Sequence, residues 1–276
     1  NFPKDYRRLP SNNGESWGFE DQAVLSQLSA LASTQAAPYF HIALTLSTHN
    51  PFLINDASRY EALFESRLKQ LKLSKAKHNM ALENKKQLTS IMNLDDALRQ
   101  FFATYRLREE FKNTIFIITG DHAMPEIPLQ TKINRYHVPL VIYSPLLKTK
   151  RRFQHTVSHF DIAPSILAFY RENYQLKTPE QVTWIGRGLD IGASKPSIGV
   201  PMMQSKSQLI DFVYADMHIN DNRMFKLGSK LNEEPFGDAS ADQAMKKRFD
   251  TFREMNKQFI KSSSLLPDSV YKKFFQ

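Results

Sequence analysis

An aspartate and a histidine stand next to each other directly after a short apolar run of the chain. Residues 114–118 read TIFII, a β-rich run typical of a buried strand, and Asp121 and His122 follow it closely. A carboxylate and an imidazole at a strand end can turn toward one metal ion, and this mixed ligand set suits zinc or manganese. Because an isolated Asp-His dipeptide is more often a surface turn, the prediction of a metal site depends on the surrounding elements.

A second polar cluster follows another apolar run. Residues 40–46 read FHIALTL and predict a buried strand, and the polar residues 47–50 come directly after it. Since α/β sheets bind ligands at the carboxyl ends of their strands, we expect this cluster to lie at a ligand-binding site. His49 is therefore a candidate for contact with a substrate. The alternative is a polar side chain that caps the strand end.

The elements around these clusters predict a sheet covered by helices. Residues 56–86 and 88–111 are expected to form two helices, the second of which covers the sheet, and residues 138–143 form a third apolar strand. Residues 161–170 predict a helix that begins at Asp161 as its cap. Strands that alternate with helices favour an α/β fold, with a mostly parallel sheet between helices.

The last part of the chain has a different pattern from about Gly192 onward. Residues 209–217 and 223–227 flank a turn-rich stretch and predict an antiparallel hairpin. Residues 240–261 predict an amphipathic helix capped by Ser240. We therefore expect a main core over residues 1–191 and a small antiparallel and helical subdomain over residues 192–276.

Composition limits the classes of function. The 276 residues contain no cysteine, which excludes disulfides, thiolate metal sites and a cysteine nucleophile. The formal charge of +9 indicates either an ordinary basic surface or attraction to anionic partners, which are lipid headgroups, phosphorylated polymers or nucleic acid. No recognition-helix, base-stacking or zinc-finger pattern accompanies this charge, so nucleic acid is not an expected partner. No apolar stretch approaches the roughly 18–20 residues that a membrane helix needs.

Several motifs, taken in order, resemble those of a known superfamily. Four of them resemble the carboxy-terminal motifs of sulfatases, phosphoethanolamine transferases and lipoteichoic acid synthases, in the alkaline phosphatase superfamily. They read NTIFIITGDHAMPEIP, RYHVPLVIYSP, VSHFDIAPSILAFY and GRGLD. The upstream LTLSTHNPF and the Trp17-Gly18 pair resemble the lipoteichoic acid synthase and phosphoglycerol transferase branch. This resemblance makes residues 1–191 the carboxy-terminal part of a sulfatase-like catalytic core.

The resemblance implies a metal-dependent phosphotransferase that acts on a phosphoglycerol-type lipid or envelope polymer. Asp121 and His122 would be ligands of one divalent ion, with manganese favoured and magnesium or zinc as alternatives. His49 would contact the phosphoglycerol of the substrate. His137 would have a substrate role or bind a further metal, and is otherwise a packing residue. The superfamily's nucleophile comes from strands upstream of every motif matched here, so we expect no nucleophile in this chain.

The resemblance also implies partners and a location. We expect an anionic lipid or a phosphorylated glycan or polymer as substrate, and an upstream part of the same polypeptide that completes the enzyme. An amino-terminal anchor, absent from this chain, would hold the enzyme at the outer face of the cytoplasmic membrane or in the periplasm. Two alternatives remain, a sulfatase-like hydrolase or phosphoethanolamine transferase, and a non-catalytic binding module that keeps the fold.

Overall fold

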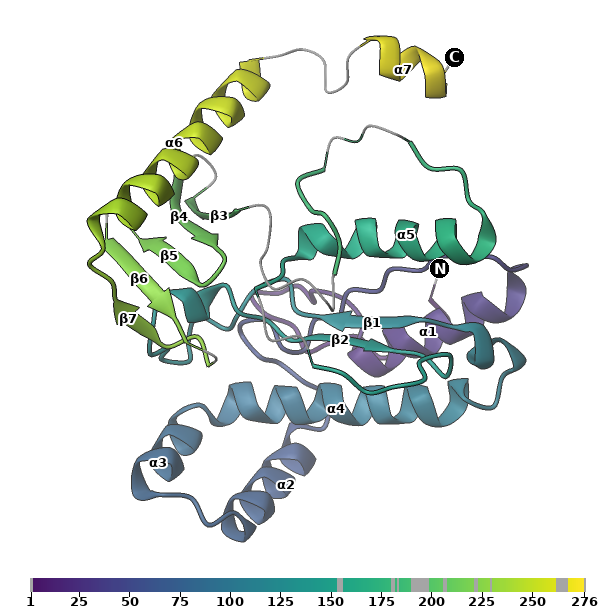
Figure 1. Ribbon diagram of the computed structural model, residues 1–276. Coiled ribbons are helices and arrows are strands. Elements are labelled where there is room, and N and C mark those ends of the chain that lie inside the picture. The colour runs from purple at the N-terminus through teal and green to yellow at the C-terminus, as the bar shows by residue number, and fades with distance from the viewer. Residues whose placement is uncertain are drawn as a thin grey trace. The chain divides into compact units, whose positions relative to one another are not determined.

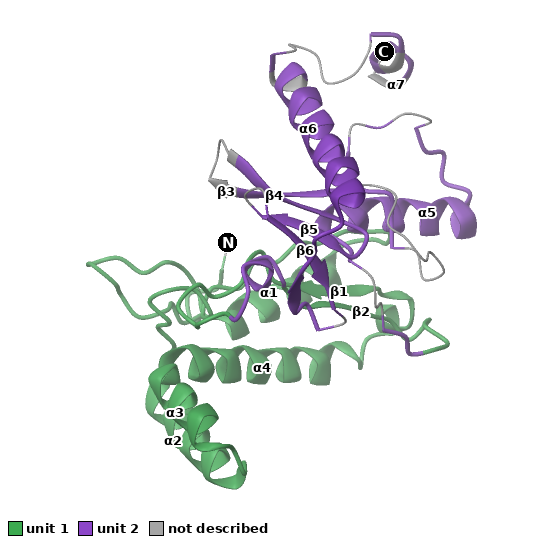
Figure 2. Ribbon diagram, turned by 60° about the vertical axis from the view of Figure 1, so that its left-hand side comes forward, with its two compact units in different colours: residues 1–129, 138–149 green, residues 130–137, 150–276 purple. Residues whose placement is uncertain are grey.

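The chain divides into two compact units, shown in different colours in Figure 2. Unit 1 comprises residues 1–129 and 138–149, and unit 2 comprises residues 130–137 and 150–276. The computed structural model describes residues 2–152, 156–179, 182, 184–189, 199–205, 208–220, 223–228, 230–261 and 268–275. The boundary predicted between residues 191 and 192 lies outside the described residues and stays a prediction.

Unit 1 is built mainly from helices (Figure 1). They are α1 (Asp21–Thr34), α2 (Ala57–Gln70), α3 (Lys75–Glu83) and α4 (Lys85–Tyr105), followed by the 3-10 turn η1 (Glu109–Asn113). The helix predicted over residues 56–86 is two helices, because α2 ends in an extended Leu71 and the side chain of Ser74 caps α3 by accepting from the amide of Lys77. The helix predicted over residues 88–111 is α4 together with η1.

The core of unit 1 lies between α1, α4 and a short strand. Leu25 and Ala32 of α1 pack with Ala97, Phe101 and Tyr105 of α4, and Phe116 of the strand joins this cluster. The rings of Phe102 and Phe116 lie 4.9 Å apart, edge to face. The prediction that the helix after residue 88 covers the sheet is therefore confirmed.

The sheet of unit 1 has two strands, β1 (Phe116–Thr119) and β2 (Leu140–Tyr143). Both match predicted strands to within a few residues. They pair antiparallel, so that Phe116 lies opposite Tyr143 and Thr119 lies opposite Leu140. The mostly parallel sheet expected from the sequence is not confirmed, since the strands within the described ranges all pair antiparallel.

The strand predicted over residues 40–46 is absent from this structure. The segment has no regular secondary structure and pairs with no strand in the described part of the chain. Phe40, Ile42 and Leu44 are exposed at 73%, 83% and 67% of their surface. The prediction was wrong because an apolar run becomes a buried strand only where neighbouring strands complete its hydrogen bonds.

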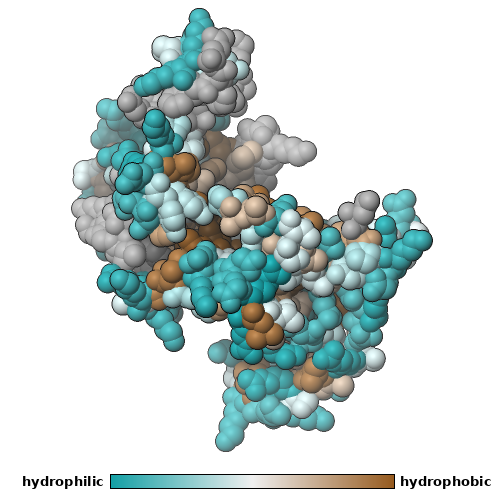
Figure 3. Space-filling model, turned by 90° about the vertical axis from the view of Figure 1, so that its right-hand side faces the viewer, coloured by the Kyte–Doolittle hydropathy of each residue, from teal (hydrophilic) through white to brown (hydrophobic). Residues whose placement is uncertain are grey.

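On the face shown in Figure 3, apolar patches interrupt a mostly hydrophilic surface.

Unit 2 contains an antiparallel sheet whose strands follow one another in chain order. They are β3 (Val200–Ser205), β4 (Gln208–Tyr214), β5 (Met217–Asn220), β6 (Arg223–Leu227) and β7 (Glu233–Pro235). The predicted hairpin is confirmed in the β5–β6 pair. Its first arm is two strands, because Ala215 adopts a left-handed backbone with φ 55° and turns the chain between β4 and β5. Residues 221 and 222 of the predicted turn lie outside the described residues.

The helices of unit 2 include a long one that packs on this sheet. Met245 and Phe249 of α6 (Ala239–Lys261) contact the apolar face formed by Phe212, Ile219 and Met224. The remaining elements are the 3-10 turns η2 (Ile133–Arg135) and η3 (His159–Asp161) and the helices α5 (Ile162–Tyr174) and α7 (Asp268–Phe275). Within the described residues, no helix combines the length and apolar character that a bilayer crossing requires.

The helix predicted from Asp161 begins in a different way from the one expected. Ser158 starts a capping box at η3, in which Asp161 is the third residue and accepts from the Ser158 amide at 2.9 Å. The other carboxylate oxygen of Asp161 accepts from the amides of Arg187 and Gly188, at 3.0 and 3.3 Å. A Cβ at Gly186 would lie 1.8 Å from the carbonyl oxygen of Phe160, so this turn needs glycine.

The cap of α6 is Asp238, whereas the sequence pattern predicted Ser240. One oxygen of Asp238 accepts from the amides of Ser240 and Ala241, at 2.9 and 3.1 Å, and from the Ser240 hydroxyl at 2.7 Å. These hydrogen bonds, led by the one from the Ser240 side chain, lower the pKa of Asp238. The cap therefore stabilises the helix above the ordinary pKa of an aspartate, and the effect is lost as the pH falls.

Asp238→Ala is expected to lower the thermal unfolding temperature by roughly 2–4 °C, because two amides of the first turn lose their acceptor. Ser240→Ala removes only a hydroxyl donor and should change it less. The two variants are compared by circular dichroism at neutral pH. If Ser240→Ala lowers the unfolding temperature more than Asp238→Ala does, Ser240 is the cap of α6.

Candidate functional site

Asp121 and His122 lie in the loop that follows β1. The Thr119 hydroxyl at the end of β1 donates to the carbonyl oxygen of Pro139 at 2.8 Å, which ties the start of this loop to the residue before β2. The His122 amide donates to Asp121 Oδ1 at 3.0 Å, and Asp121 Oδ2 lies 3.7 Å from His122 Nε2. The two side chains therefore converge, and both are exposed, at 72% for Asp121 and 58% for His122.

The hydrogen bond of the His122 ring fixes which nitrogen is free. His122 Nδ1 lies 2.8 Å from the carbonyl oxygen of Ala123. Because a carbonyl oxygen only accepts, Nδ1 carries the proton in this bond and Nε2 of the neutral ring keeps its lone pair. Histidines that bind metals commonly donate the second ring N–H to a carbonyl in this way. His122 is thus oriented as a ligand would be.

These two residues fit one divalent ion as part of its ligand set. A separation of 3.7 Å between Asp121 Oδ2 and His122 Nε2 is close to that of two ligands whose bonds to one ion are about 2.0–2.2 Å long. Within the described ranges, no group of three or more His, Asp or Glu residues could hold a metal. Asp121 and His122 therefore supply two donors, and their assignment as metal ligands stays a prediction.

His49 lies at the end of a turn in the other polar loop. The His49 amide donates to the carbonyl oxygen of Leu46 at 3.0 Å, which closes the turn. Its Nδ1 lies 2.7 Å from the carbonyl oxygen of Asn50, so Nε2 of the neutral ring again keeps its lone pair. The His49 ring is 4.8 Å from the ring of Trp17 and 6.3 Å from the ring of His122. The structure thus brings three of the predicted site residues together.

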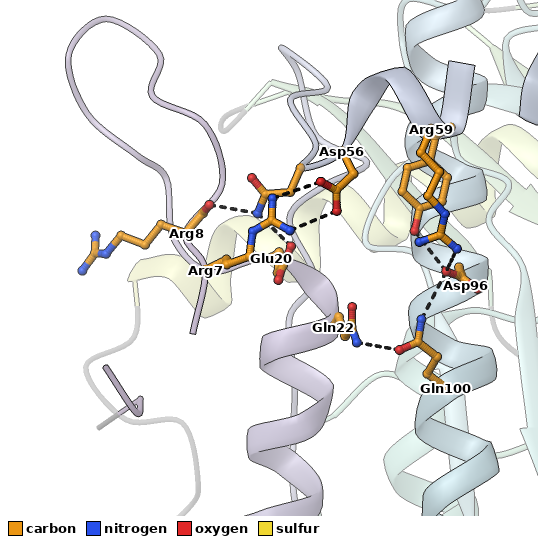
Figure 4. A network of polar contacts seen from close by, with 10 residues as sticks. Arg7, Arg8, Glu20, Gln22, Asp56, Arg59, Asp96 and Gln100 are labelled. Carbon is orange, nitrogen blue, oxygen red and sulfur yellow. Dashed lines mark hydrogen bonds and ion pairs between the residues drawn. The ribbon is translucent and has the colours of Figure 1, made fainter. Parts of the chain in front are cut away.

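Polar contacts hold the His49 loop in place at several points. Asn50 donates to Glu126 Oε1 at 2.9 Å and so joins this loop to the one that carries Asp121 and His122. Further along, Asn55 donates to Glu20 Oε2 at 2.7 Å. Glu20 is part of the network of polar contacts in Figure 4. In the same network Arg7 donates two hydrogen bonds to Asp56, at 3.0 and 3.3 Å, and lowers the pKa of that carboxyl.

His137 belongs to unit 2, where it is exposed at the end of the segment 130–137. Its amide donates to the carbonyl oxygen of Asn134 at 3.3 Å, just after η2. Asp121, His122 and His49 all belong to unit 1. The substrate role of His137 therefore stays a prediction.

A buried aspartate supports the His49 loop, and sequence reasoning did not find it. Asp21, the first residue of α1, is fully buried and accepts hydrogen bonds from Leu46 and Ser47. An acidic residue at a helix start is ordinarily explained by the helix dipole. Its position four residues after Trp17 is the one signal that links it to the site, and it does not reveal the tertiary partner.

Unit 2 contains a buried charged cluster that the sequence did not indicate either. Asp211 of β4 and His218 of β5 are fully buried, and His218 Nδ1 lies 2.6 Å from Glu233 Oε1. Asp211 Oδ2 accepts from Lys132 and from the Tyr136 hydroxyl, each at 3.0 Å. These contacts attach the segment 130–137 to the sheet of unit 2.

The charges of this cluster affect one another. Burial acts to raise the pKa of Asp211, but the neighbouring His218 and the hydrogen bonds from Lys132 and Tyr136 outweigh it and lower the pKa. Burial and the neighbouring Asp211 raise the pKa of Tyr136 to about 12. Asp211 is therefore an anion held in the interior by two donors of the segment 130–137, with His218 of β5 beside it.

Comparison with known proteins supports the motif-based resemblance. A profile of the family described as Sulfatase matches residues 2–170, a range that includes both site loops. Lipoteichoic acid synthase-like YvgJ of Bacillus subtilis (strain 168) is 23% identical over 159 residues, which is 52% of this chain. The match is 24% of YvgJ, so the chain spans about a quarter of the length of that curated relative. Because the family profile covers more than half of the chain, this protein belongs to the sulfatase family, within the alkaline phosphatase superfamily.

Proposed function

We propose that this chain is part of a metal-dependent phosphotransferase that acts on a phosphoglycerol-type lipid or envelope polymer. The observation that carries the proposal is that Asp121 and His122 of one loop lie close to His49 of another. Membership of the sulfatase family supports hydrolase or transferase chemistry. Similarity to a protein described as lipoteichoic acid synthase-like favours the phosphoglycerol branch.

Each residue of the site has a distinct task in this proposal. Asp121 Oδ2 and His122 Nε2 would hold one divalent ion, manganese by preference, with magnesium or zinc as alternatives. When bound, the ion would supply positive charge that neutralises the phosphate oxygens. His49 Nε2 would accept a hydrogen bond from the glycerol, or would carry a proton to the leaving oxygen. Trp17 packs against the His49 ring and restricts its orientation. The nucleophile would come from another segment of the polypeptide.

The proposal includes a location and partners. We propose that the enzyme works outside the cytoplasm, at the outer face of the cytoplasmic membrane or in the periplasm, through an anchor in another part of the polypeptide. Its substrate would be an anionic lipid or a phosphorylated glycan or polymer. The formal charge of +9 favours approach to anionic headgroups.

A sulfatase-like hydrolase is the second candidate, because the family match itself favours it. The two are separated by measuring, with the intact protein, transfer from phosphatidylglycerol vesicles and hydrolysis of a p-nitrophenyl sulfate ester. Release of diacylglycerol with no sulfate-ester hydrolysis supports the phosphotransferase. Sulfate-ester hydrolysis with intact phosphatidylglycerol overturns it.

His49→Ala is expected to leave the bound metal in place and to lower kcat/KM on phosphatidylglycerol by roughly 10²–10⁴-fold, the usual range for loss of a general acid or base. Metal content is measured by atomic emission, and kinetics on vesicles of fixed composition. His78→Ala, on α3 outside both site loops, is the matched control. If kcat/KM is unchanged in His49→Ala, His49 has no role in turnover and only caps the end of the preceding segment.

A further inference from the structure

Asp21 is a buried carboxylate whose hydrogen-bond donors, among the described residues, all come from the turn that carries His49. Leu46 and Ser47 donate their amides to Oδ1, at 2.8 and 3.1 Å, and the Ser47 hydroxyl donates to Oδ2. Asp21 and Ser47 are both fully buried. A buried carboxylate is tolerated only when such bonds replace its hydration, so Asp21 needs these three donors. In return, the carboxylate holds the three donor groups in place.

The turn held by Asp21 ends at His49. Leu46 and Ser47 are its first two residues, and the His49 amide closes it on the carbonyl oxygen of Leu46. With both amides fixed on one buried oxygen, the peptide planes at the start of the turn cannot rotate. We propose that Asp21 is the positioning residue of His49, a clamp that sets where the His49 ring lies relative to His122.

The residues just before Asp21 hold the same turn from a second side. A Cβ at Gly18, where φ is +151°, would lie 2.8 Å from Leu46 Cδ1, and Trp17 contacts the His49 ring. The segment 17–21 therefore meets the turn at its first residue, at its buried serine and at its histidine. These contacts come from one short stretch of chain, so a shift of α1 would be transmitted to the ring of His49.

The geometry predicts which substitutions at Asp21 are tolerated. In Asp21→Asn the amide oxygen still accepts from both backbone amides, and the new NH₂ donates to the Ser47 hydroxyl oxygen after the hydroxyl turns. In Asp21→Ala three buried donors lose their acceptor. Asparagine should therefore rescue the position of His49, whereas alanine should not. A role that depends only on negative charge at the start of α1 predicts that both variants fail.

The first test needs no assumption about the reaction. Amide hydrogen exchange is followed by mass spectrometry on peptides that cover residues 44–49 of the intact protein. Asp21→Ala is expected to speed exchange at Leu46 and Ser47 by roughly tenfold or more, and Asp21→Asn to keep the native rate. Asp95→Ala, on the exposed face of α4, is the control that should change nothing. Native protection in Asp21→Ala would overturn the clamp.

The second test rests on the proposed function and asks whether Asp21 acts through His49. Asp21→Ala is expected to lower kcat/KM on phosphatidylglycerol vesicles by about 100-fold, as a misplaced group does, with metal content unchanged. In a His49→Ala background the same change should have no further effect, because the ring it positions is gone. Independent losses that multiply would overturn the positioning role and leave Asp21 as a general stabiliser.

The two tests separate failure of this inference from failure of the proposed function. If the native protein does not use phosphatidylglycerol, the proposed substrate is wrong, and the exchange measurement still decides for or against the clamp. If Asp21→Ala does not fold, Asp21→Ser replaces it, since its shorter polar side chain withdraws the carboxylate from the Leu46 and Ser47 amides. Faster exchange at residues 46 and 47 in Asp21→Ser then supports the clamp, and an unchanged rate contradicts it.

Discussion

Asp121→Ala is expected to abolish stoichiometric divalent metal and turnover in the intact protein. The structure places Asp121 Oδ2 and His122 Nε2 3.7 Å apart, so the substitution removes one of two neighbouring donors and the only anionic one of the pair. Mutation of residues that only hydrogen-bond to metal ligands already lowers metal affinity by about 10–100-fold. Loss of a ligand itself should lower the affinity further. Metal content after dialysis, measured by atomic emission, is the direct readout.

Two comparisons make this result specific to the ligand. Asp121→Asn keeps an oxygen donor without its charge and should retain some metal. Asp95→Ala changes the same residue type on the exposed face of α4 and should leave metal content and turnover unchanged. If the metal stays bound in Asp121→Ala and turnover is native, Asp121 is not a ligand and the metal site lies elsewhere.

Asp211→Ala is expected to lower the free energy of unfolding of unit 2 by about 3–5 kcal/mol, the range for removing one partner of a buried ion pair. Lys132 and Tyr136 would lose the oxygen that both contact at 3.0 Å, and the fully buried His218 would lose its neighbour on β4. Because these contacts attach the segment 130–137, exchange protection of that segment should fall together with that of β4 and β5. Urea unfolding followed by circular dichroism measures the loss.

The same carboxylate makes the stability of unit 2 depend on pH. The pKa of Asp211 in the folded protein is lower than its ordinary value. The unfolded chain therefore binds a proton more readily, and the contribution of Asp211 is fully present above its unfolded pKa of about 3.9. It is lost as the pH falls from there through the lowered pKa of the folded state.

Asp211→Asn is the matched control, because asparagine keeps the shape of aspartate and removes only its charge. Its oxygen can accept from Lys132 and Tyr136, and its NH₂ can face His218 Nε2, which lies 3.6 Å from the carboxylate. This variant should be less destabilised than Asp211→Ala and should lose the part of the acid dependence that Asp211 contributes. Equal destabilisation by both variants, or an acid dependence unchanged in Asp211→Asn, would show that the buried charge is not what holds the cluster.

The elements that position the site were predicted with unequal success, for a physical reason. β1 and β2 and the cover by α4 follow from local apolar patterns, and the structure confirms them. Residues 40–46 carry the same kind of pattern, yet they form no strand among the described residues. An apolar run shows that a segment prefers to be buried, whereas a strand also needs partners for its backbone, and these lie elsewhere in the chain.

The chemistry-bearing residues of unit 1 were identified from the sequence because their signal is local. Asp121, His122 and His49 each follow an apolar run at a position where a loop begins, and the structure places the rings of the two histidines 6.3 Å apart. Their roles as metal ligands and substrate contact remain predictions. Only the fold brought the two loops together, because α2, α3, α4, η1 and β1 separate them along the chain.

By itself, the sequence determined the family, the strands β1 and β2 beside Asp121 and His122, and the residue types available for the chemistry of the site. The tertiary structure alone decided that Asp21 serves the His49 turn and that Asp211 is held by Lys132 and Tyr136. It also decided the antiparallel pairing of the strands. The reason is that a buried carboxylate and a strand edge take their hydrogen-bond partners from wherever packing delivers them, and no local pattern records that choice.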